Sequence, residues 1–276
     1  MLAYKLKIYA ENKLDELHAL RTNRLHRRLL VLITNYDCTL KCKHCGNLVP
    51  YIKNKERYDV DVLKKDIDNL SDVLFVNHVQ LQGGEPLLHP QLDKIIEHLS
   101  KSKLTRHINM ATNGTLTIPD KMLKTFRDCK VNIKCATYNT KHQKIQKLKQ
   151  QCEENDINLH IFDVSNSTWF DFGGINTTKD NNNIRVQKRF DGCGYKTCYT
   201  LSDGLFTKCS RAPTGHLTGL HPFYPTDHVN VRKNKNTLKH RLKLFLDNKH
   251  FLGACRYCRY NYYKEVIAGE QIKDDK

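Results

Sequence analysis

The chain has 276 residues, enough for one large domain and a small one, and 39% of the residues are hydrophobic. No apolar run approaches the length of a bilayer span, and residues 1–20 carry charges throughout without the apolar centre of a secretory signal, so we expect a cytoplasmic protein with no membrane contact. Lys and Arg outnumber Asp and Glu by 46 to 29, a net charge of +17, which favours an anionic partner.

Helix-like and strand-like stretches alternate along the chain after a charged helix or arm at residues 5–28. Segments with helical apolar spacing separate five predicted strands. Asp59, Pro90 and Pro119 stand where three of these helices would begin. The strands are expected at 29–33, 73–81, 105–111, 131–137 and 157–162. Such βα repetition predicts an α/β fold with a parallel sheet and right-handed crossovers.

The predicted strands alternate polar and apolar residues, whereas strands buried on both faces would be apolar throughout. In the second strand, for example, Gln80 and Gln82 flank Leu81. We therefore expect the apolar face to meet the helices and the polar face to line a lumen for a polar ligand. An open sheet with one wet face is the alternative. Lys134, on the polar face, is a candidate to neutralise a carboxylate.

Three thiols lie within eight residues soon after the first strand, at Cys38, Cys42 and Cys45. This short spacing lets one loop wrap a single metal centre, and clustered thiolates suit zinc or an iron–sulfur cluster. A zinc site would take His44 or a distant cysteine as its fourth ligand. A [4Fe–4S] cluster held by three thiolates would instead keep one iron free for another ligand.

Two further motifs follow the next two strands, Gly83-Gly84-Glu85 and Thr112-Asn113-Gly114. Glycines let the backbone approach a ligand closely, and Glu85 can accept a hydrogen bond from an ammonium group. With the cysteine loop, these motifs resemble in order and spacing the cluster-binding and cofactor-binding motifs of the radical S-adenosylmethionine (SAM) enzymes.

The resemblance to radical SAM enzymes implies a partial (β/α)6 barrel and a [4Fe–4S] cluster on the three clustered thiols. The free iron would chelate SAM, and an electron from a flavodoxin- or ferredoxin-type reductant would pass through the cluster and split SAM into methionine and a 5′-deoxyadenosyl radical. The residues expected to bind SAM are Gly83, Gly84, Glu85, Thr112, Asn113 and Lys134.

The polar stretch 163–189 contains the aromatic run 169–172, which could cap the barrel mouth or stack on a substrate, and Asn181–Asn183 is expected to form a flexible turn. Beyond it, Asp203-Gly204 predicts a tight hairpin and residues 237–246 predict a helix. Five cysteines occur in this part of the chain, Cys193, Cys198, Cys209, Cys255 and Cys258.

This C-terminal pattern resembles the twitch domain, a shortened form of the SPASM extension of radical SAM enzymes, and implies one auxiliary [4Fe–4S] cluster. Cys209, Cys255 and Cys258 are expected ligands, and the sequence leaves open whether Cys193 or Cys198 is the fourth. Zinc on the same thiolates is the alternative. The expected division is an N-terminal arm at 1–28, the barrel at 29–189 and the twitch-like domain at 190–276. Cys129, Cys135 and Cys152 fit small core residues.

The resemblance extends to compact twitch-bearing enzymes that act on carbohydrates or cyclitols. It implies a radical SAM oxidoreductase that dehydrogenates or epimerises a sugar-like small molecule or glycan, which the basic charge allows to be anionic. In an epimerase a thiol returns a hydrogen atom, and whichever of Cys193 and Cys198 is not a ligand is a candidate catalytic donor.

Three alternatives stay open. A peptide-modifying maturase is one, although only about 28 residues precede the first strand, which is short for a peptide-recognition domain. A nucleic-acid-modifying enzyme is favoured by the charge alone, because no RNA-binding module is recognisable. The third is a non-catalytic iron–sulfur protein.

Overall fold

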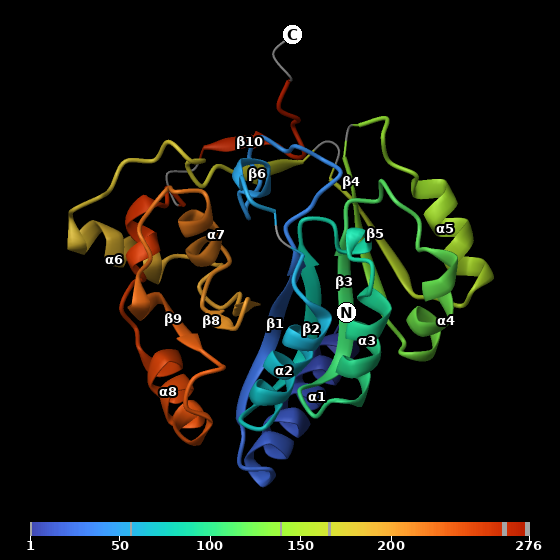
Figure 1. Ribbon diagram of the computed structural model, residues 1–276, viewed down its shortest axis with the longest axis horizontal. Helices are drawn as coiled ribbons and strands as arrows, with labels where there is room; N and C mark the ends of the chain where they lie inside the picture. Colours follow the sequence, from blue (N-terminus) through green and yellow to red (C-terminus); the bar gives the residue numbers. More distant parts are fainter. Residues whose placement is uncertain (1, 56, 139, 165–166, 261–263, 274–276) are drawn as a thin grey trace.

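The computed structural model describes residues 2–55, 57–138, 140–164, 167–260 and 264–273. Their main sheet has eight strands in the order β5-β4-β3-β2-β1-β7-β8-β9 (Figure 1). The strands are β1 (Leu25–Asn35), β2 (Leu74–Gly83), β3 (Thr105–Thr112), β4 (Asn132–Thr137), β5 (Leu159–Asp163), β7 (Thr200–Ser202), β8 (Leu205–Thr207) and β9 (His228–Asn230). Pairings from β5 to β1 and between β1 and β7 are parallel, so the predicted α/β class with a parallel sheet is confirmed.

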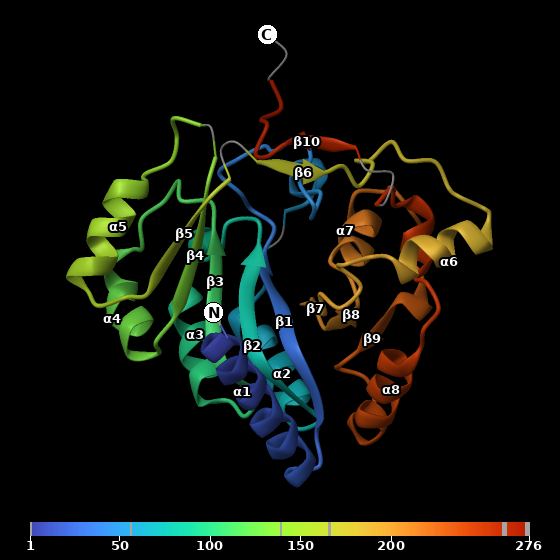
Figure 2. The same cartoon turned by 180° about the vertical axis from the view of Figure 1, so that it is seen from behind.

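One face of the sheet is covered by the helices that follow the first four strands (Figures 1 and 2). Asp59 caps the first of them by accepting from the backbone N–H groups of Asp61 and Val62, as expected of this residue type. Cys135 and Cys152 are buried in the core between sheet and helices. The helices are α2 (Val60–Ser71), α3 (Leu92–Lys101), α4 (Asp120–Asp128) and α5 (Ile145–Glu154).

Helix α1 (Leu2–Arg21) lies on the opposite face, across the amino-terminal parts of β1 and β2 (Figure 2). Asp15, which is 2% exposed, fixes it there. The Asp15 carboxylate accepts from the Asn77 amide at 2.5 Å and pairs with Arg106 at 2.6 Å. Most of the expected N-terminal arm is therefore a packed helix that covers one end of the polar face, whereas residues 25–28, the last of that arm, are the start of β1.

The C-terminal part adds a hairpin, three helices and a separate pair of strands. The predicted turn at Asp203-Gly204 connects β7 to β8, and the helix predicted at 237–246 is present as α8. Its other elements are β6 (Thr168–Phe170), which pairs antiparallel with β10 (Glu265–Ile267), and the helices α6 (Asn183–Asp191), α7 (Arg211–Leu217) and α8 (Lys235–Asp247). Across both parts, the described residues also form four short 3₁₀ helices, η1 (Val49–Tyr51), η2 (Pro86–Leu88), η3 (Pro225–Asp227) and η4 (Gly253–Tyr257).

The expectation of a flexible turn at Asn181–Asn183 is wrong. The Asn182 side chain accepts from the backbone N–H of Arg185 and caps α6, which starts at Asn183. Asparagine favours both turns and helix caps because its short side chain bonds to nearby backbone groups, so composition alone does not separate the two.

The C-terminal elements are joined to the parallel part of the sheet by β7 and by a buried ion pair. Asp66 of α2 is 0% exposed, and its carboxylate accepts hydrogen bonds from the Nε and Nη2 of Arg232, each at 2.8 Å. Arg232 also reaches Asp203 at 2.8 Å. A domain boundary at residues 189 and 190 stays a prediction, since β7 continues the same sheet.

We expect Arg232→Met to lower the free energy of unfolding by about 2 to 3 kcal/mol, because the buried Asp66 carboxylate would lose its partner while the arginine itself is partly exposed. The control is Lys243→Met, which removes an exposed i,i+4 pair with Asp247 and should cost less than about 0.5 kcal/mol. Denaturant unfolding of both variants measures the difference. Equal losses of unfolding free energy in the two variants would contradict a stabilising role for the Arg232–Asp66 ion pair.

No helix in the described part of the chain combines the length and apolar character needed to cross a bilayer.

Candidate functional site

The three clustered thiols lie in the loop that leaves the carboxyl end of β1. Cys38, Cys42 and Cys45 line one cavity of about 420 Å³, which opens beside the ends of β2, β3 and β4. Ligands bind at this end of a parallel sheet because strand termini and loops converge there. The sequence-predicted trio is therefore brought together at one ligand-sized space.

Burial raises the pKa of all three thiols, that of Cys42 to about 11. A metal would hold them as thiolates by replacing the proton. Two side-chain amides point their N–H groups at the sulfurs: Asn113 donates to Cys38 Sγ at 3.6 Å and Gln271 donates to Cys42 Sγ at 3.3 Å. Such donors stabilise anionic sulfur. Sequence reasoning missed Gln271, which lies far from every motif.

Gly83 and Gly84 bring the end of β2 against the chain that enters the cysteine loop. Gly83 has a φ of +145°, and a Cβ there would overlap the carbonyl oxygen of Asn35. A Cβ at Gly84 would overlap the carbonyl oxygen of Asp37. The Glu85 N–H donates to the same Asp37 carbonyl at 2.7 Å. Both glycines are thus required by the close approach of two backbones.

Glu85 lies behind the cavity wall, at 0% exposure, and ties two predicted motifs together. Its carboxylate accepts from the Thr112 hydroxyl at 2.9 Å and from the Asn113 N–H at 2.9 Å. Thr112 and Asn113 themselves line the cavity, and the Asn113 amide donates to Thr39 of the cysteine loop at 3.0 Å. Glu85 therefore acts as a positioning residue here. Its contact with the SAM ammonium stays a prediction.

Burial raises the pKa of Glu85 from 4.5 to about 7. The folded protein then binds this proton more tightly than the unfolded chain, so the free energy of unfolding should fall as pH rises from about 4.5 to about 7. We expect Glu85→Gln to flatten that fall, and Glu265→Gln, at an exposed position, to leave it unchanged. Denaturant unfolding of the metal-free unmodified protein and of both variants, at about pH 4.5 and at about pH 7, measures this change in stability. The same fall in unfolding free energy in all three proteins would refute the role of Glu85.

Lys134 and the glutamines of the polar face line the same cavity, as the strand alternation predicted. Gln80 donates to Gln82 at 2.7 Å, and both glutamines line the cavity that the thiols line. Lys134, on β4, supplies a cation to the space. The arrangement offers thiolates for a metal, close backbone at Gly83, and amide and ammonium groups for a polar ligand.

A neighbouring cavity of about 400 Å³ shares Gln80, Gln82 and Trp169 with the first. Its walls come from both halves of the chain. The cysteine loop contributes His44 and Asn47, and the C-terminal part contributes Cys198. Four aromatic side chains, those of Trp169, Phe170, Phe172 and Tyr195, also line it. His44 lines this second cavity and faces Glu270 at 3.4 Å, so it does not join the three thiols.

The structure separates the five C-terminal cysteines into four and one. Four of them, Cys193, Cys209, Cys255 and Cys258, line one small cavity between α6, the start of α7 and η4, whereas Cys198 lines the cavity next to the cysteine loop. Cys209 borders both. Burial, with smaller contributions from the neighbouring Cys258 and Cys193, raises the pKa of Cys209 to about 12. The geometry thus places Cys193, which the sequence could not choose over Cys198, with the other three.

The four-thiol cavity fits an anionic group such as a cluster with four thiolates. Lys196, Lys208 and Arg211 line it, and no carboxylate does. Arg211 is 7% exposed, and its Nη1 is buried without a hydrogen-bond partner. The other terminal nitrogen, Nη2, donates to the Gly174 carbonyl at 3.2 Å. A buried N–H group without an acceptor is costly unless a negative ligand completes it. Among the described residues, no three His, Cys, Asp or Glu side chains are arranged around a single metal ion.

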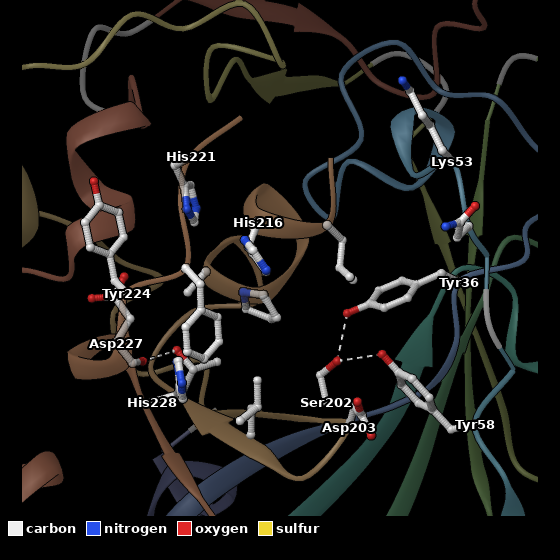
Figure 3. A pocket seen from close by; sticks show the side chains of 17 residues that line it. Tyr36, Lys53, Tyr58, Ser202, Asp203, His216, His221, Tyr224, Asp227 and His228 are labelled. Atoms are coloured by element: carbon white, nitrogen blue, oxygen red, sulfur yellow. Dashed lines mark hydrogen bonds between the residues drawn. The ribbon is translucent and has the colours of Figure 1, made fainter. Parts of the chain in front are cut away.

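A third cavity, of about 330 Å³, is lined by described residues none of which is a cysteine (Figure 3). Tyr36 and Tyr58 meet there on the Ser202 hydroxyl, at 2.9 and 3.1 Å. Three histidines, His216, His221 and His228, line the other side. Sequence reasoning missed this pocket, because its residues come from distant segments without a shared motif.

A parallel α/β sheet whose strand ends hold three thiols beside a ligand cavity defines a metal- and ligand-binding barrel protein. Residues 32–155 match the family model of the radical SAM superfamily, and the chain carries a radical SAM domain there. A domain of this family uses a [4Fe–4S] cluster and SAM, and the three thiols and adjoining cavity fit both.

Curated relatives match parts of the chain. A GTP 3′,8-cyclase of Aquifex aeolicus is 29% identical over 149 residues, 51% of this chain and 44% of that protein. A putative glycyl-radical enzyme activating enzyme of Methanocaldococcus jannaschii is 32% identical over 90 residues, 32% of this chain and 35% of that one. The chain spans less than half the length of the curated relatives it matches.

Among solved structures, BtrN in complex with AdoMet and 2-DOIA superposes with a TM-score of 0.51 at 18% identity. The match covers 88% of this chain and 96% of that one. At this identity the similarity shows a shared fold, and the fold extends through the C-terminal part of the chain.

Proposed function

We propose that the protein is a radical SAM oxidoreductase that acts on a sugar-like substrate held between its two groups of thiols. One observation carries this proposal: the cavity of about 400 Å³ has the cysteine loop on one side and Cys198 and Cys209 on the other. A substrate there would lie next to the SAM cavity, since the two cavities share residues.

In this proposal Cys38, Cys42 and Cys45 hold the [4Fe–4S] cluster, which with SAM supplies a 5′-deoxyadenosyl radical. Gly83 and Gly84 hold the end of β2 against the cysteine loop at the cavity wall, where their backbone faces the ligand, while Thr112 and Asn113 are held there by Glu85. Lys134 neutralises a carboxylate in the same space. The four-thiol cavity holds one auxiliary cluster, with Arg211 donating to it.

The lining of the second cavity suits a hydroxylated ring. Aromatic faces such as Trp169 pack against the C–H face of a sugar, and amides such as Asn47 and Gln82 exchange hydrogen bonds with its hydroxyl groups. BtrN, which shares this fold, was solved with AdoMet and 2-DOIA, and this supports a small-molecule substrate. A peptide substrate is the alternative.

Cys198 favours epimerisation over dehydrogenation. Burial raises the pKa of its thiol, so Cys198 keeps its S–H at neutral pH. After the radical removes a hydrogen atom from one face of the substrate, this thiol can return a hydrogen atom to the other face. The resulting thiyl radical then takes one electron and one proton, which a flavodoxin- or ferredoxin-type reductant and solvent supply. Because thiolate-held clusters need a reducing compartment, a cytoplasmic location belongs to the proposal.

The test is turnover in heavy water. Anaerobically reconstituted protein is given SAM, a reductant and a panel of sugars and aminocyclitols, with short peptides as the comparison set. We expect one sugar-like compound to gain deuterium at a single carbon while 5′-deoxyadenosine forms. A ketone without deuterium would indicate dehydrogenation. Modification of peptides alone would overturn the sugar assignment.

A further inference from the structure

A strongly basic cavity of about 250 Å³ adjoins the auxiliary thiols. We call it the basic cleft. Five cationic side chains and one carboxylate, that of Asp180, line it, which gives a local charge of +4 from five positive charges and one negative. The cationic residues are Lys179, Arg185, Arg189, Arg256 and Arg259.

The single carboxylate of the basic cleft is fully engaged by the protein itself. Asp180 pairs with Arg185 at 2.7 Å and with Arg189 at 2.8 Å, and these bonds hold its pKa well below the usual range. Arg256 donates to the backbone carbonyl of Asp180 and to the Asn183 side chain. Asp180 therefore organises the arginines around it and leaves a net positive surface for an outside anion.

Lys179 and Arg259 present their charges to solvent. Both are exposed, and neither side chain has an ion-pair partner in the described part of the chain. The aliphatic part of the Arg259 side chain packs against Gly173, where an added Cβ would come within 2.9 Å of the Arg259 Cγ. This contact holds the base of the side chain in place while the guanidinium extends into solvent. Exposed charges of one sign steer an oppositely charged partner and set its rate of association.

Cys258 lies between the basic cleft and the four-thiol cavity, because it lines both. A partner seated in the cleft would be separated from a group held by the four thiols by little more than this side chain. Electron transfer slows steeply with distance, so a short path matters to a redox partner. A nucleic acid is less well matched, since no aromatic side chain lines the cleft for base stacking.

We propose that the basic cleft is the docking site of an acidic protein that carries single electrons. The inference rests on the proposed function, because a redox partner is needed here only if the four thiols hold an electron-transferring cluster. It adds to that function the place on the molecule, next to Cys258, where a small protein with an acidic face around its redox group would dock.

The test is a charge reversal with a matched control. Lys179→Glu/Arg259→Glu changes the cleft by four charge units and breaks no described side-chain bond. Lys141→Glu/Lys147→Glu makes the same change at exposed positions near and on α5, at the opposite edge of the molecule (Figure 1). Binding of a purified acidic flavodoxin to the reconstituted enzyme is measured by calorimetry at low and at moderate salt.

We expect the cleft variant to bind flavodoxin at least about tenfold more weakly and with a smaller salt dependence, and the control to change less than about twofold. Equal weakening in the two variants would overturn the docking site. The docking site would also be overturned if the unmodified protein bound a transfer RNA through Lys179 and Arg259 but did not bind flavodoxin. The iron content of each variant shows whether it carries its clusters. If the charge-reversed variant does not fold, the charge-neutral Lys179→Gln/Arg259→Gln variant takes its place.

SAM cleavage driven by dithionite separates this inference from the proposed function. Dithionite needs no docking site, so the cleft variant should cleave SAM at the rate of the unmodified protein. If the unmodified protein fails to cleave SAM with dithionite, the proposed function fails. If SAM cleavage with dithionite is normal and the cleft variant binds flavodoxin as tightly as the unmodified protein does, only the docking inference fails.

Discussion

Cys42→Ala is expected to abolish SAM cleavage, with a rate of 5′-deoxyadenosine formation more than about 10⁶-fold below that of the unmodified protein. Three thiolates are the fewest that hold a [4Fe–4S] cluster while leaving one iron open. Cys42 is one of the three that line the cavity, and its sulfur receives the Gln271 amide. Without this thiolate the cluster should be lost during reconstitution.

Iron and sulfide content, electron paramagnetic resonance of the reduced protein and 5′-deoxyadenosine formation measure the effect together. Cys129→Ala is the matched control, because Cys129 is partly buried against the core near Ser100 and lines neither thiol cavity. It should retain its iron and its activity. A Cys42→Ala protein that still cleaves SAM, or an unmodified protein that binds zinc in place of iron, would refute the assignment of the cysteine loop.

The barrel part of the molecule could be predicted because its determinants are local. Apolar spacing along the chain marked the five parallel strands and the helices between them, and each motif followed a strand end. Parallel strands end at the same edge of a sheet, so residues far apart in sequence, such as Cys38 and Asn113, had to meet there.

The role of Glu85 depends on tertiary placement, which no local pattern in the sequence reveals. A glutamate after two glycines reads as a ligand contact. In the structure the same carboxylate is buried and satisfied by Thr112 and Asn113, which only the packing of β2 against β3 brings within reach. The third cavity, with Tyr36 and the histidines, was missed for the same reason.

The choice between Cys193 and Cys198 also lay beyond spacing, since either distance to Cys209 can close a loop around a cluster. In the structure Cys193 comes directly after α6 and lies with Cys258, whereas Cys198 comes just before β7 and lines the neighbouring cavity. The two thiols should therefore behave differently when each is removed.

Cys193→Ala is expected to lower the iron content from about eight to about four atoms per chain, because it removes one of four ligands of the auxiliary cluster while leaving the first cluster intact. Cys198→Ala should keep all of its iron. It should instead lose deuterium uptake into the substrate, by about 10²-fold or more, because the thiol that returns the hydrogen atom is gone.

Iron analysis and mass spectrometry of the product in heavy water read the two effects separately, and each variant serves as the control for the other. The opposite pattern, iron loss in Cys198→Ala and full retention in Cys193→Ala, would show that Cys198 is the fourth ligand. Normal deuterium uptake by an iron-replete Cys198→Ala protein would remove the thiol from the reaction. Another hydrogen-atom donor would then have to reach the substrate cavity, which has the cysteine loop on one side and Cys209 and Arg211 on the other.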